Sequence, residues 1–475
     1  MLPSRKSRFA AVIGTALALL LVLPPPAQAQ PAGTEISFTG GGGIQLQGTL
    51  ITPTKPTRTA VVIQGGSSWE TRDDLLEHAE MFADLGVAAF VYDRRTVGYS
   101  KTQRDYGLLA DDLLGAVEAL RTRPDIDPAR VGVWGVSEGA WVAPLAATRS
   151  PAISFVIAVG ISTMGGARQT SWFWQNVLRH QGITGSIIDS VTFNGTRFAV
   201  ASGLFSEADY DTVPVFEQLR QPLLALWGEY DINHPPEESS KTLLEALRRG
   251  GNQHYAIRIV PGGGPDLEKT ADRGYDKPEA FAPAYSEIVG AWLADTSKTV
   301  VDPAPKQDRP TTPLPPLSWY ESLWMQAFAF LVFIVAFAAY PVFALVARIR
   351  GNRLRVVKSA RWFVLAGTTA VAGFVGYFGY LQMQGMRHLG LILLGRPIPW
   401  LVLQLLAVAA VVLTVLTART YWRERRDFTG ASRVRVLIQL VAGAVFVLWG
   451  LYWGLLLPDG RRWVVSGNKC SNKVF

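Results

Sequence analysis

The stretch Gly135-Val136-Ser137-Glu138-Gly139 joins a β-type run at residues 130–134 to a helix-like run at 140–147. Glycines on both sides of a serine allow a sharp, strained turn, because glycine brings no side-chain bulk to the bend. Such a turn holds the serine hydroxyl above the sheet edge, beside the free amide groups of the helix N-terminus. The stretch therefore predicts a nucleophile on an α/β fold. The alternative is an ordinary turn of small residues.

Short apolar runs alternate with amphipathic runs along this part of the chain. After a hairpin pattern at 34–53, the apolar runs fall at 60–63, 88–92, 131–134, 155–159, 223–227 and 255–260. This alternation is typical of a mostly parallel sheet wrapped by helices. Residues 163–217 interrupt the pattern and predict a small helical cap. Its aromatic residues Trp172, Phe173 and Trp174 either line an apolar pocket or pack within the cap.

The N-terminus has the pattern of a secretory signal. Arg5, Lys6 and Arg8 precede an apolar stretch at 9–23 and a small-residue cleavage motif at 27–29. This pattern predicts a cleaved signal peptide over residues 1–29, with an uncleaved membrane anchor as the alternative. The single cysteine, Cys470, excludes an intramolecular disulfide.

Four apolar segments follow the α/β region, at about 323–347, 362–381, 398–418 and 436–457. Each is close to the length that crosses a bilayer. The arginine-rich loops 348–361 and 419–435 are expected in the cytoplasm, which places the α/β domain and the C-terminus outside. Several aromatic residues then fall at the membrane interfaces. The outer set is Trp319, Tyr320, Trp324, Trp400, Trp449 and Trp453, and the inner set is Trp362 and Trp422.

These signals predict four parts: a signal peptide at 1–29, an α/β domain at 30–296, a proline-rich extended linker at 297–318, and a four-span membrane domain at 319–475. The four spans serve either as an anchor or as a transport or partner-sensing unit.

The full sequence has a net charge of +8, but residues 30–297 contain about 22 Lys and Arg against about 32 Asp and Glu. The acidic domain argues against a nucleic-acid partner.

Four blocks of sequence resemble a known superfamily. They are Val61-Val62-Ile63-Gln64-Gly65-Gly66, Tyr92-Asp93-Arg94-Arg95-Thr96-Val97-Gly98-Tyr99-Ser100, Asp125-Ile126-Asp127-Pro128-Ala129-Arg130, and Trp227-Gly228-Glu229-Tyr230-Asp231. With the serine turn, their order and spacing resemble the alpha/beta-hydrolase superfamily, in particular its exported bacterial esterase and serine-aminopeptidase-like branch. The resemblance covers roughly residues 34–295.

The resemblance implies a role for each matching residue. Ser137 would be the nucleophile and Asp231 the acid that orients a catalytic imidazole. The Gly65-Gly66 turn and the N–H of Glu138 would form the oxyanion hole. Asp93 and the segment 94–100 are expected to brace the loops rather than to take part in the chemistry.

The catalytic histidine of this superfamily is missing from its expected place. Relatives have proline, glycine, two small residues and then histidine after the last strand, whereas this chain has Pro261-Gly262-Gly263-Gly264-Pro265. Pro265 occupies the histidine position and has no basic side chain, so it cannot accept the proton of the serine.

The chain has five histidines that could replace it. His234 is the best candidate, because it lies three residues after Asp231 at the correct sheet edge, although this closeness to the acid limits its reach toward the serine. His180 lies in the predicted cap and could hang over the pocket. The others are expected elsewhere: His78 on the surface of the first crossover helix, His254 at the opposite edge of the sheet, and His388 in the membrane region.

The sequence thus favours an exported, membrane-anchored serine hydrolase with its domain on the periplasmic or extracellular side. Its partners would be a small-molecule ester or acyl substrate and membrane lipid. Ester, thioester, lactone and peptide substrates remain open. The alternatives are a pseudoenzyme that acts as a membrane-tethered binding or sensing protein, and an ordinary enzyme altered only at residue 265. The sequence contains no metal-ligand cluster or phosphate-binding loop, so we expect no cofactor or metal.

Overall fold

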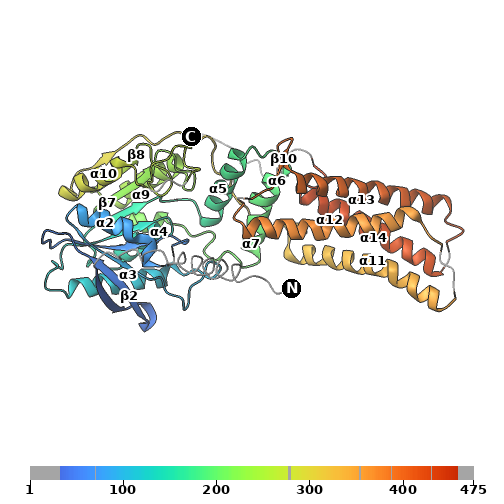
Figure 1. Ribbon diagram of the computed structural model, residues 1–475, viewed down its shortest axis with the longest axis horizontal. Helices are drawn as coiled ribbons and strands as arrows, with labels where there is room; N and C mark the ends of the chain where they lie inside the picture. Colours follow the sequence, from blue (N-terminus) through green and yellow to red (C-terminus); the bar gives the residue numbers. More distant parts are fainter. Residues whose placement is uncertain are drawn as a thin grey trace, which may run out of the picture.

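The computed structural model describes residues 33–69, 71–276, 280–351, 355–386, 388–428 and 430–457. The predicted signal peptide at 1–29 and Cys470 lie outside these residues. The molecule is elongated, with an α/β domain at one end, a bundle of long helices at the other and short helices between them (Figure 1).

In the described part of the chain, nine strands form one sheet in the order β1-β2-β4-β3-β5-β6-β7-β8-β9. The strands are β1 (Thr34–Thr39), β2 (Gln45–Ile51), β3 (Ala60–Gln64), β4 (Ala88–Tyr92), β5 (Val131–Val136), β6 (Val156–Val159), β7 (Leu223–Gly228), β8 (Tyr255–Val260) and β9 (Val300–Val301). β1 and β2 form an antiparallel hairpin, and β2 also pairs antiparallel with β4. From β4 to β9 every pair is parallel. The predicted mostly parallel sheet is confirmed.

Helices cover both faces of this sheet. One face carries η2 (Arg72–Leu75), α2 (Leu76–Asp84) and α10 (Pro283–Ala294), and the other carries α3 (Tyr106–Arg121), α4 (Gly139–Arg149), α8 (Val213–Gln218) and α9 (Pro236–Gly250). Successive residues of β3 alternate between the two cores: Val62 packs in one, and Val61 and Ile63 in the other. Burial on both faces explains why the central strands are continuously apolar.

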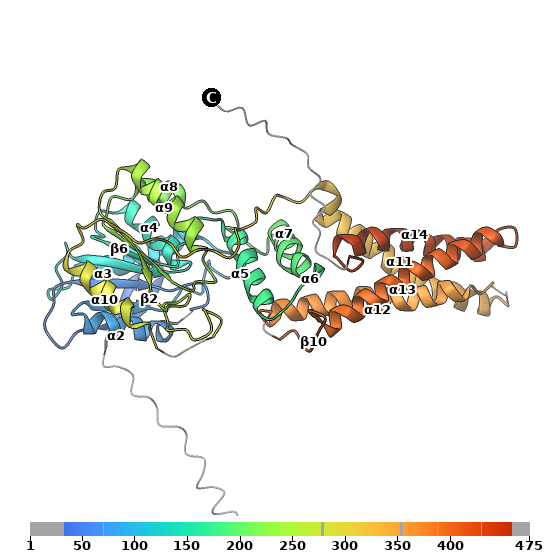
Figure 2. The same cartoon turned by 90° about the horizontal axis from the view of Figure 1, so that it is seen from above.

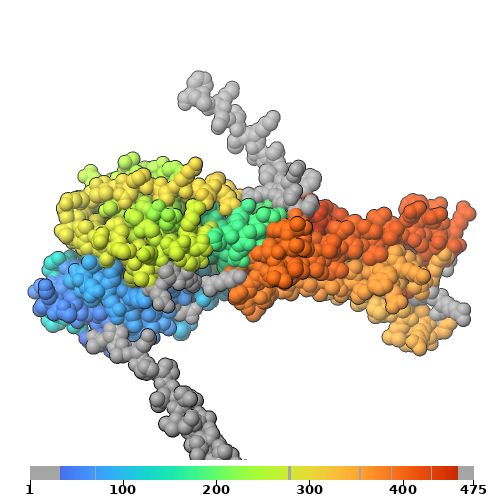
Figure 3. Space-filling view, turned by 45° about the horizontal axis from the view of Figure 1, so that its top comes forward, coloured from blue at the N-terminus to red at the C-terminus, as the bar shows by residue number. Residues whose placement is uncertain are grey.

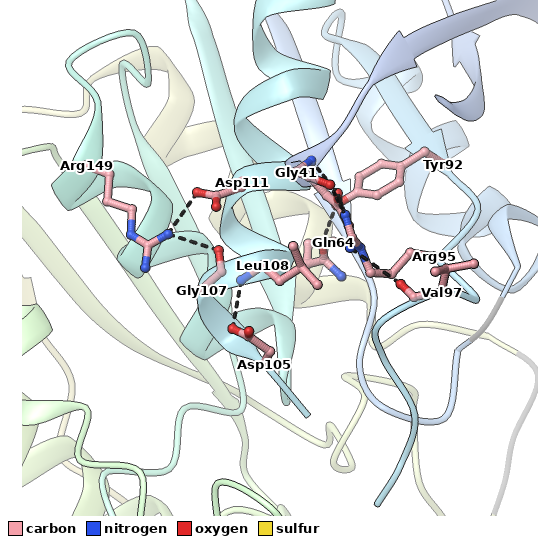
Figure 4. Close-up of polar contacts among 11 residues, drawn as sticks. Gly41, Gln64, Tyr92, Arg95, Val97, Asp105, Gly107, Leu108, Asp111 and Arg149 are labelled. Carbon is pink, nitrogen blue, oxygen red and sulfur yellow. Dashed lines mark hydrogen bonds and ion pairs between the residues drawn. The ribbon is translucent and has the colours of Figure 1, made fainter. Parts of the chain in front are cut away.

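A buried ion pair fixes the glycine turn η1 (Gly41–Gly43) to α3. Asp112 accepts the Gly41 N–H at 2.8 Å, and Arg95 donates to Asp112 at 2.5 Å and to the Gly41 carbonyl at 2.6 Å. Nearby, Arg149 of α4 donates to Asp111 and to the Gly107 carbonyl, both at 2.9 Å, and so links α4 to α3 (Figure 4). The contacts of Arg149 hold α4, the helix that follows the serine turn, against α3.

The insertion between β6 and β7 is helical. It contains α5 (Gly166–His180), α6 (Ser186–Ile188), the π-helical turn η3 (Asp189–Asn194) and α7 (Gly195–Ala201) before α8. We call α5, α6, η3 and α7 the cap helices. They lie between the sheet and the long helices in both ribbon views, so they do not form a free-standing lid (Figure 2).

The four long helices are α11 (Leu323–Ile349), α12 (Lys358–Met383), α13 (Ile398–Arg423) and α14 (Gly430–Tyr452). A short turn η4 (Trp319–Glu321) precedes them, and a hairpin of β10 (Ile392–Leu393) and β11 (Arg396–Pro397) joins α12 to α13. By length and composition, each of the four helices could cross a membrane.

The cap helices pack against one end of this bundle. Leu178, Ile187 and Val191 share an apolar cluster with bundle residues. Buried hydroxyls reinforce the contact: Ser186 donates to the Gly454 carbonyl and Ser190 to the Trp453 carbonyl, each at 2.6 Å. Figure 3 shows no gap between the cap helices and the bundle on the face in view. Cap and bundle therefore share one core.

Two expectations change at this contact. Trp400, Trp449 and Trp453 are buried rather than exposed at a membrane interface, because all three rings pack around Phe374 of α12. Phe198 of the cap helix α7 also contacts Trp453. The segment 297–318 lacks helix, as expected of an extended linker, but it does not hang free. It contributes β9 to the sheet, and its Gln307 and Thr311 N–H groups donate to Glu237 and Glu238 at the start of α9, both at 3.0 Å.

Candidate active site

Ser137 occupies a strained turn at the end of β5. Its φ of 54° lies in the left-handed region, which residues other than glycine seldom adopt. Both glycines of the turn are required by close packing: a Cβ on Gly135 would lie 2.1 Å from the Gly139 carbonyl oxygen, and a Cβ on Gly139 would lie 2.2 Å from that of Gln64. The turn that the sequence predicted is thus built, and it raises Ser137 above the end of the sheet.

Ser137 lies between two neighbouring loops. Its N–H donates to the Val159 carbonyl at 2.9 Å, which fixes it beside the end of β6. On the other side, a Cβ on Gly66 would lie 3.2 Å from the Ser137 Cβ and 3.9 Å from its Oγ. The Gly66 turn after β3 is therefore close enough to present backbone amides to a group bound at Ser137.

Arg94 connects the Gly65-Gly66 turn to Glu138, the residue after Ser137. It donates to the Gly65 carbonyl at 2.9 Å, to the Gly66 carbonyl, and to the Glu138 carboxylate at 2.8 Å. Tyr99 adds a hydrogen bond to the same carboxylate at 2.6 Å, and burial together with the Glu138 charge raises the pKa of Tyr99. The phenol therefore stays protonated as a donor. The expectation that segment 94–100 braces loops is confirmed for Arg94 and Tyr99.

Glu138 has two separate functions in this arrangement. Its buried carboxylate holds Arg94, with side-chain exposures of 2% and 6%. Its N–H lies at the first turn of α4 and has no acceptor among the described residues. A free amide at a helix N-terminus stabilises negative charge, so this N–H is suited to one position of an oxyanion hole.

Asp231 and His234 form a buried pair in the loop after β7. One carboxylate oxygen of Asp231 accepts the N–H groups of Asn233 and His234 at 2.8 Å, and the other lies 3.0 Å from His234 Nδ1. Both side chains are almost fully buried. Because an ionised carboxylate only accepts, Nδ1 carries the proton and Nε2 is left as the basic nitrogen.

The environment of His234 favours its protonated form. Burial alone would lower the pKa of His234, but the charge and hydrogen bond of Asp231, with a contribution from Asp266, raise it above its ordinary value. A carboxylate that orients an imidazole and stabilises its cation is what a catalytic base requires.

Gly160 provides the space for this imidazole. It follows β6, has a φ of 63°, and a Cβ there would lie only 2.5 Å from His234 Nδ1. Since β6 lies between β5 and β7, the ring lies over the strand end that separates Asp231 from Ser137. No hydrogen bond joins the Ser137 hydroxyl to the ring among the described residues. Catalytic hydrogen bonds often tighten only when substrate is bound.

The remaining histidines are engaged elsewhere. His78 was expected on the helix surface, and this is wrong. Its ring centroid lies 4.5 Å from those of Trp134 and Phe281, and burial lowers its pKa to about 3. The helix turns His78 toward the sheet, where it behaves as a neutral core residue. His180 Nε2 lies 2.9 Å from Asp272 Oδ2, and His180 lines the cavity described below.

His254 and His388 lie away from Ser137. His254 immediately precedes β8, at the opposite edge of the sheet as expected, and its Nδ1 is 3.4 Å from the Ser297 carbonyl. His388 follows α12 near the β10–β11 hairpin.

The loop after β8 contains Pro265 in a buried position. A Cβ on Gly228, at the end of β7, would lie 2.1 Å from the Gly264 carbonyl oxygen, so this loop packs tightly on the neighbouring strand end.

The structure brings six of the predicted site residues together at one edge of the sheet: Gly65, Gly66, Ser137, Glu138, Asp231 and His234. Sequence reasoning missed Gly160, whose signal is its place directly after the apolar run at 155–159.

A cavity of about 290 Å³ lies beside Asp231. Trp172 of α5 forms part of its wall, whereas Trp174 packs on the apolar cluster of the bundle. Trp172 thus lines a pocket as expected, although charged side chains also line that pocket, and Trp174 packs in an apolar core. In the described residues, no group of His, Cys, Asp and Glu side chains is arranged to hold a metal ion.

Part of the chain is similar to known proteins. Residues 77–281 match the prolyl oligopeptidase family. Thiohydrolase apmlB of Arthrinium phaeospermum is 30% identical over 129 residues, which are 26% of this chain and 42% of that protein. Polyketide transferase claH of Penicillium crustosum is 31% identical over 137 residues, covering 27% and 44%. The chain thus spans less than half the length of these curated relatives.

Among solved structures, the Pyrococcus furiosus esterase Pf2001 is 16% identical and covers 58% of this chain and 97% of its own, with a TM-score of 0.41. The structure of DcsB in complex with a substrate analogue is 17% identical and covers 56% and 99%, with a TM-score of 0.42. The sheet order, the serine turn and the family match together show an alpha/beta-hydrolase fold, which four long apolar helices follow in the chain.

Proposed function

We propose that this protein is an exported, membrane-anchored serine hydrolase that cleaves carboxylic esters. Ser137 is the nucleophile, His234 the base and Asp231 the acid that orients it. The observation that carries the proposal is the buried Asp231–His234 pair, 3.0 Å apart, which lies over Gly160 next to the serine turn.

The reaction follows from these positions. Ser137 Oγ attacks the ester carbonyl carbon while His234 Nε2 takes the hydroxyl proton. The carbonyl oxygen becomes negative and is stabilised by the N–H groups of Gly66 and Glu138. The tetrahedral intermediate collapses, His234 returns the proton to the departing alkoxide, and the alcohol leaves an acyl group on Ser137. Water activated by His234 then releases the acid and restores the serine.

A histidine at position 234 can replace the one missing at 265. The order nucleophile, acid, base is kept along the chain, and the base approaches from the same edge of the sheet. The bonds from Asp231 to two backbone N–H groups fix the loop, so that the short spacing between acid and base positions the imidazole. Gly160 leaves the ring room to extend toward β5.

The arrangement of the bundle supports membrane anchoring. Large apolar side chains such as Leu331, Ile334 and Leu405 are exposed on its surface, as lipid contact requires. The two arginine-rich connections, after α11 and after α13, join the helices at the end far from the hydrolase domain (Figure 1). With those connections in the cytoplasm, the hydrolase domain would face the periplasm or the exterior.

The test uses the full-length protein in detergent, because removing the bundle would expose the apolar face of the cap helices. Purified protein is treated with a fluorophosphonate probe and assayed with 4-nitrophenyl butyrate. We expect labelling and hydrolysis, with both abolished by Ser137→Ala. Labelling that persists in the Ser137→Ala variant would overturn the assignment of the nucleophile.

A second candidate function is a membrane-tethered binding protein without turnover. Pro265 and the absence of a hydrogen bond between Ser137 and His234 among the described residues favour it. It predicts that the wild-type protein neither reacts with the probe nor hydrolyses the ester, yet retains a folded domain with the cavity beside Asp231. Probe labelling together with turnover would exclude it.

A further inference from the structure

The cavity beside Asp231 is rich in positive charge. Its walls come from the loop after β7, from α5, from residues 273–275 and from residues 305–309. Four cationic side chains line it: Arg179, Arg273, Lys306 and Arg309. We call this cavity with its four cations the basic pocket.

Three carboxylates, Glu229, Asp231 and Asp308, also line the pocket, so the four cations exceed the acidic side chains by one. Asp231 is engaged by His234, and Glu229 accepts the Gly262 N–H at 2.9 Å. Among the described residues, neither Arg179 nor Arg309 forms an ion pair with a carboxylate. Other arginines of the hydrolase domain, such as Arg94, Arg95 and Arg149, do form such ion pairs.

Arg309 shows the electrostatic strain most clearly. Burial and the neighbouring Arg179 charge lower the pKa of Arg309, against the opposite effect of Tyr275 and Asp308. The Nε atom of Arg309 is buried without a hydrogen-bond partner. Two guanidinium groups that repel each other are stabilised by an anion between them, which both can bind through planar, paired hydrogen bonds.

The contacts of Arg273 and Arg309 fix the positions of two of these cations. Arg273 adopts a φ of 50°, uncommon for a residue other than glycine, and its guanidinium lies 5.9 Å from the ring centroid of Tyr230. The Arg309 carbonyl accepts hydrogen bonds from Trp172 Nε1 at 3.1 Å and from Gln307 Nε2 at 3.2 Å. Arg309 is half-buried and held through its own carbonyl, whereas Arg179, Arg273 and Lys306 are exposed side chains that line the cavity.

We propose that the basic pocket binds a carboxylate or phosphate group carried by the substrate of the neighbouring serine site. This proposal rests on the proposed function and adds a substrate class to it: anionic esters with an apolar portion. Trp172 and Tyr275 offer aromatic surface to that portion, with Tyr275 stacked on His180 at 3.7 Å. Asp231 lines the pocket and also binds His234, so the pocket lies next to the Asp231–His234 pair.

The linker completes the pocket. Lys306 and Arg309 belong to the segment that connects the hydrolase domain to the bundle, and this segment is held on α9 through Gln307 and Thr311. A domain truncated before residue 305 would lack two of the four cations. The experiment therefore uses the full chain.

Binding is measured by calorimetry on the Ser137→Ala variant in detergent, so that turnover does not interfere. The probes are monobutyl phosphate and inorganic phosphate. We expect monobutyl phosphate to bind, with a dissociation constant raised at least tenfold by Arg179→Gln combined with Arg309→Gln. The matched control is Arg248→Gln, an exposed arginine of α9 without an ion pair among the described residues, which should leave the constant unchanged.

Each outcome decides a separate point. Equal binding by the control and the double variant would overturn the basic pocket as an anion site. Inorganic phosphate that binds as tightly as monobutyl phosphate would overturn the assignment to a substrate-borne group and indicate a free anion instead. If the wild-type protein hydrolyses no ester while monobutyl phosphate still binds through Arg179 and Arg309, the proposed function fails and the anion site stands.

The same pocket predicts a preference among substrates. For full-length protein with Ser137 intact, kcat/KM for mono(4-nitrophenyl) succinate relative to 4-nitrophenyl butyrate should fall about tenfold in the double variant. A ratio that does not change would show that the pocket plays no part in substrate selection.

Discussion

The loops after β7 and β8 lie side by side at the same edge of the sheet, yet they differ in what they contribute. The loop after β7 contains Asp231 and His234, whose backbone and side-chain hydrogen bonds fix both groups within four residues. The loop after β8 has three glycines and Pro265. It presses its Gly264 carbonyl against Gly228 and supplies no base.

This contrast shows what an imidazole needs in order to serve such a site. It needs an orienting carboxylate, a route to the serine, and a strand end between them that leaves room for the ring. Asp231 provides the first, and Gly160, at the end of the intervening strand β6, provides the space. On the proposed assignment of His234 as the base, the space that Gly160 leaves for the ring matters more than which loop carries the imidazole.

The largest effect should come from deleting the imidazole. We expect His234→Ala to reduce kcat/KM for 4-nitrophenyl butyrate by about 10³-fold or more, because removal of a triad member leaves only the residual catalysis of the oxyanion hole. The matched change in the other loop, Pro265→Ala, should stay within about threefold of wild type. Full activity in the His234→Ala variant would show that the base lies elsewhere.

The next effect tests the space under the ring. Gly160→Ala would place a Cβ 2.5 Å from His234 Nδ1 and should lower kcat by about 10²-fold by displacing the imidazole from its working position. Gly182→Ala is the matched control, since Gly182 has a similar φ of 77° but open space around its Cβ position. Both variants share the backbone strain, so melting temperatures separate loss of stability from loss of activity. Equal activity in the two variants would refute the steric argument.

The fold was largely predictable from the sequence because its signals are local. Apolar runs of strand length that alternate with amphipathic runs indicated the strands from β3 to β8, and the strain at Ser137 follows from its flanking glycines. β9 escaped prediction. It is only Val300–Val301, and it forms by pairing with a strand that is distant in the sequence.

The parts that the sequence did not predict depend on tertiary contacts. His78 has a polar side chain in a helix, and only the packing of α2 on the sheet shows that it is buried. The aromatic residue Trp453 fits a membrane interface equally well until the cap helices are seen to cover it. Gly160 and Arg309 acquire meaning only from groups that the fold brings to them, namely His234 and Arg179.

The pH dependence of kcat/KM should show a moderate effect of His234, which lies in the loop after β7. His234 must be neutral to accept the serine proton, and its pKa is raised by Asp231. We therefore expect kcat/KM to rise with pH through an inflection above the ordinary histidine value of about 6.5. Asp231→Asn should move the inflection to lower pH while also reducing activity. An inflection below 6.5 in the wild-type enzyme would contradict the assignment.

The same pair affects stability with the opposite trend. Because the pKa of His234 is higher in the folded protein than in the unfolded chain, its contribution to stability is full below the unfolded value and is lost as pH rises through the folded value. Urea unfolding of wild type and His234→Ala should therefore give free energies of unfolding that differ more at pH 6 than at pH 9. A difference that grows with pH would mean that His234 is held neutral in the fold.

The smallest expected effect is that of placing a histidine at position 265, where the superfamily has one. In Pro265→His, the added imidazole would meet an Asp231 whose two oxygens already bind His234 and two backbone N–H groups, so it would lack an orienting carboxylate. We expect kcat/KM to stay within about threefold of wild type. The control is the same change in a His234→Ala background, which frees one oxygen of Asp231. A gain of orders of magnitude in the single variant would show that the loop after β8 retains the working position and that His234 is only a structural partner of Asp231.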